Sequence, residues 1–346
     1  ATFGGEELWL AEGTGAQGSV AQNNLESVSG KLNLQLKDAT IGHWLTCELS
    51  GGFDAKGGTG FSGKGAVTIH KDKQLAELAG YKFVLAEGAG ADAKIEQNKL
   101  TEVNGKVPFK VFDAQTQPLI EGKAEGHYYA STKKFSGTGD IRLGRDVEFQ
   151  IGGGKLVFKK GSGGGGRVTD NELRELSGTL EVDVWDSKGA IIGLKAEGKY
   201  DAVANKLIRV AGSAKLLRPI EVGGEGANAF LRIEALSGSA LVENNELKEI
   251  TGSLDLVLPK LNNMKGHFEG GWQKTASEDL FWGKGWVDFT LFKDEAKCRW
   301  VTGKVEGEYK KDKTFNLKGE IDYKMNQMLG GKLGVEVDQN LDPILS

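Results

Sequence analysis

Apolar and polar residues alternate along most of this chain with a period of two. Between residues 191 and 200, Ile192, Leu194 and Tyr200 share one set of alternate positions, and lysine or glutamate stands at 195, 197 and 199. Residues 315–323 repeat this pattern with Asn, Lys, Glu and Asp at the intervening positions. Such alternation is typical of antiparallel strands with one solvated face. The pattern therefore predicts an all-β, antiparallel fold, and we assign no segment to a helix.

One strand-rich unit recurs about four and a half times with a period of roughly 74 residues. The segments 20–38, 95–113, 168–186 and 242–260 superpose without a gap. Four strands per repeat give about eighteen strands of about ten residues each, more than one flat twisted sheet accommodates. We therefore expect a long antiparallel meander that curls, forms layers or closes.

Two kinds of residue recur at matching places in the repeats. The asparagines are Asn23, Asn98, Asn171 and Asn245, at spacings of 75, 73 and 74 residues. Asparagine tolerates the left-handed backbone region, so these positions predict tight turns, with a ladder that binds ions or sugars as the alternative. The aromatics of a Gly-x-aromatic signature are Phe53, Tyr128, Tyr200, Trp272 and Tyr309. These predict packing between neighbouring repeats, with a ligand-binding platform as the alternative.

The one low-complexity stretch, residues 160–167 (KGSGGGGR), predicts a flexible loop tip or a linker near residue 163. This places two copies of the repeat in residues 1–162. Two further copies and a partial one fall in residues 163–346. We expect one continuous array in preference to two independent domains.

Composition narrows the function classes. The 52 glycines among 346 residues suit a β protein with many turns, and 44 Lys+Arg against 48 Asp+Glu leave a net charge of −4, without the basic excess that nucleic acid requires. The only cysteines, Cys47 and Cys298, stand at non-equivalent repeat positions, which argues against a disulfide framework. Residues 1–12 lack the pattern of a signal peptide, and no apolar run reaches the ~20 residues of a membrane helix. The compartment stays open, with extracellular and particle-associated locations among the alternatives.

No motif predicts a catalytic, cofactor or metal site. Residues 13–18 match G-x-G-x-x-G, but no helix is expected to follow, and the near P-loop at 58–65 has Gly65 where a Ser or Thr should hold magnesium. The histidines lack metal-ligand spacing, and no G-x-S-x-G elbow is present. We therefore expect a non-enzymatic protein without cofactors.

Two family resemblances bear on function. The turns at Phe53-Asp54 and Tyr200-Asp201 resemble the YD strands of Rhs and toxin-complex proteins, which implies a hollow β shell. Residues 196–216 are similar to the strand-turn-strand units of lipopolysaccharide-transport β-jellyroll proteins, which implies a groove for acyl chains.

The first functional hypothesis is thus a structural or interaction protein, a scaffold or shell segment that contacts a protein partner or self-assembles through edge strands. The alternatives are a carrier with a groove for a hydrophobic ligand such as a lipid, and a membrane β-barrel, for which the expected aromatic girdles are missing.

Overall fold

The computed structural model describes residues 2–3, 6–55, 59–338 and 343–345. Strands take up 74% of the chain and short 3₁₀ turns 2%, and the described residues contain no α-helix. This confirms the predicted all-β fold. The described residues form 27 strands, because some strands are interrupted by kinks, so the expected number of about eighteen was too low.

The chain divides into two units. Unit 1 comprises Ala1–Val147, Lys160–Gly178 and Asp201–Asn205, and unit 2 comprises Glu148–Lys159, Thr179–Tyr200 and Lys206–Ser346.

The strands of unit 1 are β1 (Thr2–Phe3), β2 (Glu6–Leu10), β3 (Gly15–Ala21), β4 (Asn24–Asp38), β5 (Gly42–Asp54), β6 (Thr59–Ile69), β7 (Lys73–Leu78), β8 (Tyr81–Leu85), β9 (Gly90–Glu96), β10 (Lys99–Phe112), β11 (Ile120–Tyr129), β12 (Lys134–Leu143) and β15 (Gly163–Thr169). A unit boundary falls within β13 (Val147–Ile151), β16 (Glu172–Asp186) and β17 (Gly189–Asp201).

The elements of unit 2 are β14 (Gly154–Phe158), β18 (Lys206–Leu216), β19 (Ile220–Val222), η1 (Gly226–Asn228), β20 (Leu231–Glu243), β21 (Glu246–Leu258), η2 (Pro259–Leu261), β22 (Met264–Lys274), β23 (Asp279–Asp294), β24 (Arg299–Tyr309), β25 (Phe315–Lys324), β26 (Gly330–Asp338) and β27 (Pro343–Leu345).

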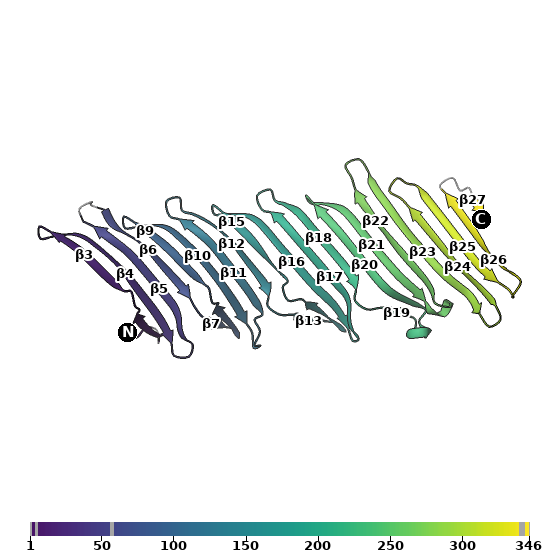
Figure 1. The fold of residues 1–346 in the computed structure, drawn as a ribbon, viewed down its shortest axis with the longest axis horizontal. Helices are drawn as coiled ribbons and strands as arrows, with labels where there is room; N and C mark the ends of the chain where they lie inside the picture. The colour runs from purple at the N-terminus through teal and green to yellow at the C-terminus, as the bar shows by residue number, and fades with distance from the viewer. Residues whose placement is uncertain (1, 4–5, 56–58, 339–342, 346) are drawn as a thin grey trace. The chain divides into compact units, whose positions relative to one another are not determined.

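Each unit is an antiparallel ladder of hydrogen-bonded strands (Figure 1). In unit 1 the ladder passes through β4, β5, β6, β9, β10, β11, β12 and β15. In unit 2 it passes through β18, β20 and then β21 to β27 in chain order. In neither unit does a described pairing join the first strand to the last. Of the three arrangements expected from the strand number, closure is therefore not what either unit shows.

Long strands pair with two shorter ones along the same edge. The first half of β4 pairs with β3 and the second half with β2, and β10 likewise pairs with β9 and then β8. Between β8 and β9 the chain kinks at residues 86–89, where Ala86 and Ala89 are buried. The period of two does not reveal such kinks, since the alternation continues on either side of them.

Buried apolar residues are few. One cluster in unit 1 joins Trp44, Ile69 and Ala89. Among the described residues, nine hydrophobic residues are buried and no large side chain is less than 2% exposed. The chain exposes 21833 Å², whereas a compact globular chain of 37.1 kDa exposes about 13,600 Å². The sheets therefore bury far less apolar surface than a protein with a central core.

The glycine run was wrongly predicted to be a flexible loop. Residues 163–167 belong to β15, which pairs with residues 138–142 of β12. A Cβ atom at Gly163 would lie 2.1 Å from the Ile141 carbonyl oxygen, and one at Gly165 would lie 2.7 Å from that of Gly139. These glycines permit the close approach of two backbones, a role that composition alone does not distinguish from flexibility.

Candidate functional site

The strand registers place apolar residues on one face of each ladder. In unit 1 this apolar face consists of even positions 28–36 of β4 and 120–128 of β11, and of odd positions 45–53 of β5, 61–69 of β6, 91–95 of β9, 103–111 of β10 and 135–143 of β12. Leu100 of β10 also belongs to it, because it pairs with Ile95 before the register shift in β10. These positions hold glycine, alanine, aliphatic and aromatic residues and Cys47. No charged side chain lies among them.

Unit 2 has an apolar face of the same kind. It consists of even positions 210–214 of β18, 236–242 of β20, 250–258 of β21 and 264–272 of β22, with odd positions 281–289 of β23, 301–309 of β24, 315–323 of β25 and 331–337 of β26. The only polar side-chain groups on it are the indole of Trp272 and the hydroxyls of Tyr309 and Tyr323. A face free of charge across eight strands indicates an environment other than water.

The apolar face of unit 1 is not covered. Eight of its side chains are between 37% and 53% exposed: Val28, Leu49, Phe53, Phe61, Leu100, Val107, Phe135 and Ile141. Monomeric soluble proteins rarely expose a contiguous apolar area larger than a few hundred Å², and larger areas mark interaction sites.

The opposite face is charged but nearly balanced. Cross-strand ion pairs join Lys31 to Glu48 at 3.2 Å in unit 1 and Lys332 to Glu320 at 3.0 Å in unit 2. Exposed pairs of this kind contribute little to stability, because water and salt screen the two charges. Their main effect is therefore to keep this face in water.

The predicted aromatics lie on the apolar face where the registers are described. Phe53 pairs with Val28, Tyr128 with Phe135, Trp272 with Phe281, and Tyr309 with Phe315. Tyr200 is the penultimate residue of β17. Each paired aromatic meets an apolar side chain of a neighbouring strand, and β23 separates Trp272 from Tyr309. The structure thus does not bring Trp272 and Tyr309 together as one stack.

Two aromatics that we did not single out are closely fitted to glycines. A Cβ atom would lie 2.6 Å from the Phe61 ring if it were added to Gly51, and 2.9 Å from it if added to Gly63. The same distances to the Phe135 ring are 2.8 Å from Gly126 and 2.9 Å from Gly137. The rings therefore lie across glycines of their own and the next strand, which covers exposed backbone. The signal in the sequence is a Phe two residues before Gly-x-Gly.

The four recurring asparagines occupy the turns of two-residue hairpins. Each has a positive φ, between 62° and 68°, and so has the residue before it, as a type I′ turn requires. The side-chain Oδ1 of Asn98 accepts a hydrogen bond from the Phe61 amide at 2.8 Å, and that of Asn171 accepts one from Phe135 at 2.8 Å. The side chains of Asn98 and Asn171 therefore tie their hairpins to the neighbouring strands β6 and β12.

A hydrogen-bonded cluster lies at the other end of the unit 1 strands. Lys73 Nζ contacts carboxylate oxygens of Asp38 and Glu6 at 2.5 Å each, and the Trp44 indole donates to Glu6 at 2.8 Å. The hydrogen bond from Lys73, and then the backbone amides of residues 40 and 41, lower the pKa of Asp38 from 3.8 to about 2. The cluster links β2, β4, β5 and β7, so its position indicates a structural role.

An apolar groove of about 420 Å³ lies on unit 1. Its apolar lining comes from β3, β4, β5 and β6 and includes Val28, Leu32, Leu49, Phe53 and Phe61. Phe53, one of the aromatic residues for which the sequence offered a ligand-binding role as the alternative, thus lines this groove.

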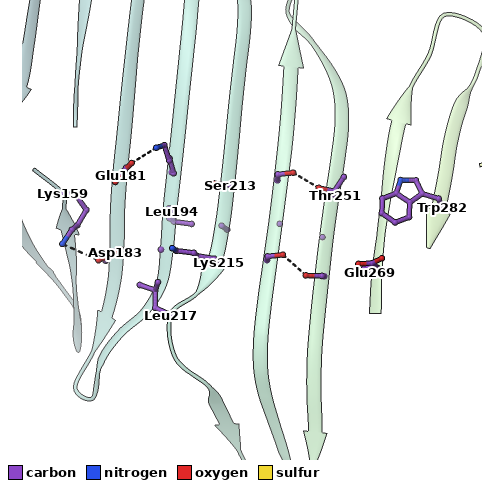
Figure 2. A pocket seen from close by; sticks show the side chains of 18 residues that line it. Lys159, Glu181, Asp183, Leu194, Ser213, Lys215, Leu217, Thr251, Glu269 and Trp282 are labelled. Atoms are coloured by element: carbon purple, nitrogen blue, oxygen red, sulfur yellow. Dashed lines mark hydrogen bonds and ion pairs between the residues drawn. The ribbon is translucent and has the colours of Figure 1, made fainter. Parts of the chain in front are cut away.

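A polar groove of about 900 Å³ lies on unit 2 (Figure 2). Its floor holds paired hydroxyls, Ser237 with Ser253 at 2.7 Å and Ser239 with Thr251 at 2.6 Å. No histidine lines it, so the hydroxyls lack the usual base that would activate a nucleophile.

The walls of the polar groove carry ion pairs (Figure 2). Lys195 contacts Glu181 at 2.8 Å, and Lys159 contacts Asp183 at 3.7 Å. The hydrogen bond between Glu181 and Lys195 lowers the pKa of the carboxyl and raises that of the amine. Both groups are thus charged near neutral pH and are poorly suited to proton transfer.

No protein-family model and no curated protein matches the chain. Within the described ranges, no three His, Cys, Asp or Glu residues are grouped so that they could hold a metal ion. Nor do those ranges contain a helix with the length and apolar character needed to cross a membrane.

Proposed function

We propose that the chain is a non-enzymatic structural segment of a larger β-sheet assembly, in which its apolar face packs against a second protein layer and its charged face meets solvent. The carrying observation is the uncovered apolar face, on which the described registers place no charged side chain. The resemblance of the Phe53-Asp54 turn to the strands of β shells agrees with this function.

A second copy of the same sheet is the occupant that the surface fits best. If a fully exposed large apolar side chain offers about 150 Å², the eight exposed side chains of unit 1, each 37–53% exposed, present on the order of 500 Å². A standard interface buries about 800 Å² per partner, and the half-buried neighbours supply the difference. Aromatic ridges beside glycine troughs suit two sheets packed face to face about 10 Å apart.

Sedimentation velocity over a range of concentrations tests this function with two matched variants. Ile141→Lys places a charge on the apolar face at a side chain that is 53% exposed, whereas Thr138→Lys places the same charge on the other face of β12. We expect wild type and Thr138→Lys to associate and Ile141→Lys to stay monomeric. Circular dichroism checks that both variants fold. Equal sedimentation of all three folded proteins would contradict the proposal.

The groove on unit 1 favours a second candidate function, a carrier for an apolar ligand such as an acyl chain. Its volume of about 420 Å³ lies within the range of small-molecule sites, and Phe53 and Phe61 line it. Native mass spectrometry of the chain with a C16 fatty acid distinguishes the two candidates. A stoichiometric adduct that Leu49→Lys abolishes supports the carrier, and its absence leaves the structural function as the better account.

A further inference from the structure

Three hairpin turns in this protein form a side-chain hydrogen bond with the strand that lies beside them. The Oδ1 atom of the second turn residue accepts a hydrogen bond from a main-chain amide in each case: Asn98 from Phe61 of β6 at 2.8 Å, Asn171 from Phe135 of β12 at 2.8 Å, and Asn245 from Leu207 of β18 at 2.7 Å. In the first two turns the main-chain amide of the asparagine also donates to the carbonyl oxygen of the same phenylalanine, at 2.8 Å in each case. The asparagine therefore fixes the register of the neighbouring strand within the first three residues of that strand.

The preceding turn residue adds a second contact in two of these turns. The Gln97 amide donates to Ser62 Oγ at 3.1 Å, and the Asp170 amide donates to Ser136 Oγ at 2.9 Å. The next residue of each recognised strand is a glycine, and it pairs with Ile95 or Val168. The strands recognised in this way, β6 and β12, thus share the sequence Phe-Ser-Gly-x-Gly.

The turn between β3 and β4 is built in the same way but has no such neighbour among the described residues. Its φ values, 51° at Gln22 and 62° at Asn23, match the 49° and 63° of Gln97 and Asn98. One side of β3 pairs with β4, and within the part of the chain that the structure describes no strand pairs with the other side (Figure 1). Asn23 is exposed, and its side chain makes no hydrogen bond to a described residue.

The sequence of β3 also lacks the usual protection of an edge. Natural edge strands avoid unwanted pairing through charged residues, proline or bulges that turn the edge away. The seven residues of β3, Gly-Ala-Gln-Gly-Ser-Val-Ala, include neither a charge nor a proline, and six of the seven are exposed. The register shift beside Ser19 and Val20 places its extra residue in β4, and the matching shift between β9 and β10 does not prevent β9 from pairing with β6. The edge is therefore open to strand addition.

We propose that the free side of β3 is a docking site for one further antiparallel strand of the Phe-Ser-Gly-x-Gly type, supplied by another polypeptide that carries this repeat. The phenylalanine amide of that strand donates to Asn23 Oδ1, its serine Oγ accepts from the Gln22 amide, and its first glycine lies opposite Val20. The site concerns an edge of the sheet and is independent of what covers the apolar face.

Fluorescence anisotropy with a labelled peptide of residues 133–143 (KKFSGTGDIRL), added to the full chain, tests the site. We expect saturable binding with one peptide per chain. N-methylation of the peptide's phenylalanine amide removes the donor to Asn23 and should weaken binding about five- to tenfold, the usual effect of one net hydrogen bond. A scrambled peptide controls for nonspecific binding.

Variants of the chain separate side-chain recognition from turn geometry. Asn23→Gly keeps the positive φ but removes the acceptor, and it should weaken the peptide about five- to tenfold. Asn23→Asp keeps an acceptor and should retain binding. Asn98→Gly makes the same change in a turn whose neighbour is already in place, so it should leave peptide affinity unchanged. Equal affinity of wild type and folded Asn23→Gly, or no saturable binding to wild type, would overturn the proposal.

Discussion

Glycine substitutions at two matched turn asparagines should differ in their effect on stability. Asn98→Gly removes an acceptor that the Phe61 amide uses at 2.8 Å, whereas Asn23→Gly removes one without a described donor. The φ values of the two positions are 63° and 62°, so the change in backbone freedom is the same in both variants. The difference between the variants therefore isolates the side-chain hydrogen bond.

The magnitude follows from these two contributions. Added chain flexibility costs each variant up to about 1 kcal/mol, and the lost hydrogen bond costs Asn98→Gly a further ~1 kcal/mol. Since 1.4 kcal/mol corresponds to a factor of ten in an equilibrium constant, the loss of the hydrogen bond alone should make local opening of the strands beside Asn98 about five times more frequent. This factor comes in addition to the effect of the added chain flexibility, which both variants share.

Hydrogen exchange measured by mass spectrometry is the suitable assay, because an array of strands opens locally and has no single unfolding free energy. Peptides from β6 and β9 should lose protection in Asn98→Gly, and those from β3 and β4 should lose less in Asn23→Gly. Equal losses in the two variants would refute the assigned role of the Asn98 side chain.

Three further predictions concern titration and packing. Because the pKa of Asp38 is lowered to about 2, its contribution to stability is present above 3.8 and lost as the pH falls towards 2. The protection factors of unit 1, which are exchange rates corrected for the pH dependence of the unfolded chain, should therefore fall between about pH 5 and about pH 2.5 in wild type but less in Asp38→Asn. Gly126→Ala should destabilise β11 by about 1–3 kcal/mol in thermal or exchange measurements, since its Cβ would lie 2.6 Å from a carbonyl oxygen, whereas Gly139→Ala, with 3.6 Å to its nearest atom, should be neutral or stabilising. The hydrogen bond to Asp255 raises the pKa of His267 above 6.5, so its contribution is present below 6.5 and lost as the pH rises through the raised value. The protection factors of β21 and β22 should therefore fall as the pH rises above 6.5, and His267→Gln should remove this dependence.

The fold class followed from the sequence because alternation with a period of two specifies strands and the side chains that share a face. The turns at Asn98 and Asn171 could be located for a similar reason, since few residues tolerate a positive φ. The aromatics were recognised individually, but the adjacent Phe61 and Phe135 were not. Their role depends on a glycine in the next strand, and only the register shows that contact.

Other features depend on contacts that alternation does not encode. The glycines at 163–167 indicated a loop by composition, yet they form a strand because two backbones come close there. The sequence does not show that Asn98 Oδ1 accepts a hydrogen bond from the Phe61 amide, because the two residues are 37 positions apart. Alternation also groups Leu49 and Ile141 on one face without showing whether a second layer covers them, and this question decides the proposed function.

Thiol labelling of the wild-type chain tests most directly whether the apolar face becomes covered. Cys47 lies on that face, opposite Leu34 and Val67, and Cys298 lies in the turn between β23 and β24; both are free and half-buried. The maleimide reaction of each is followed by mass spectrometry from about 1 μM to about 1 mM protein, a range that spans weak and moderate affinities. If two apolar faces pack together, labelling of Cys47 should slow at least about tenfold as the concentration rises, while Cys298 keeps its rate. A constant Cys47 rate over the whole range would contradict the account.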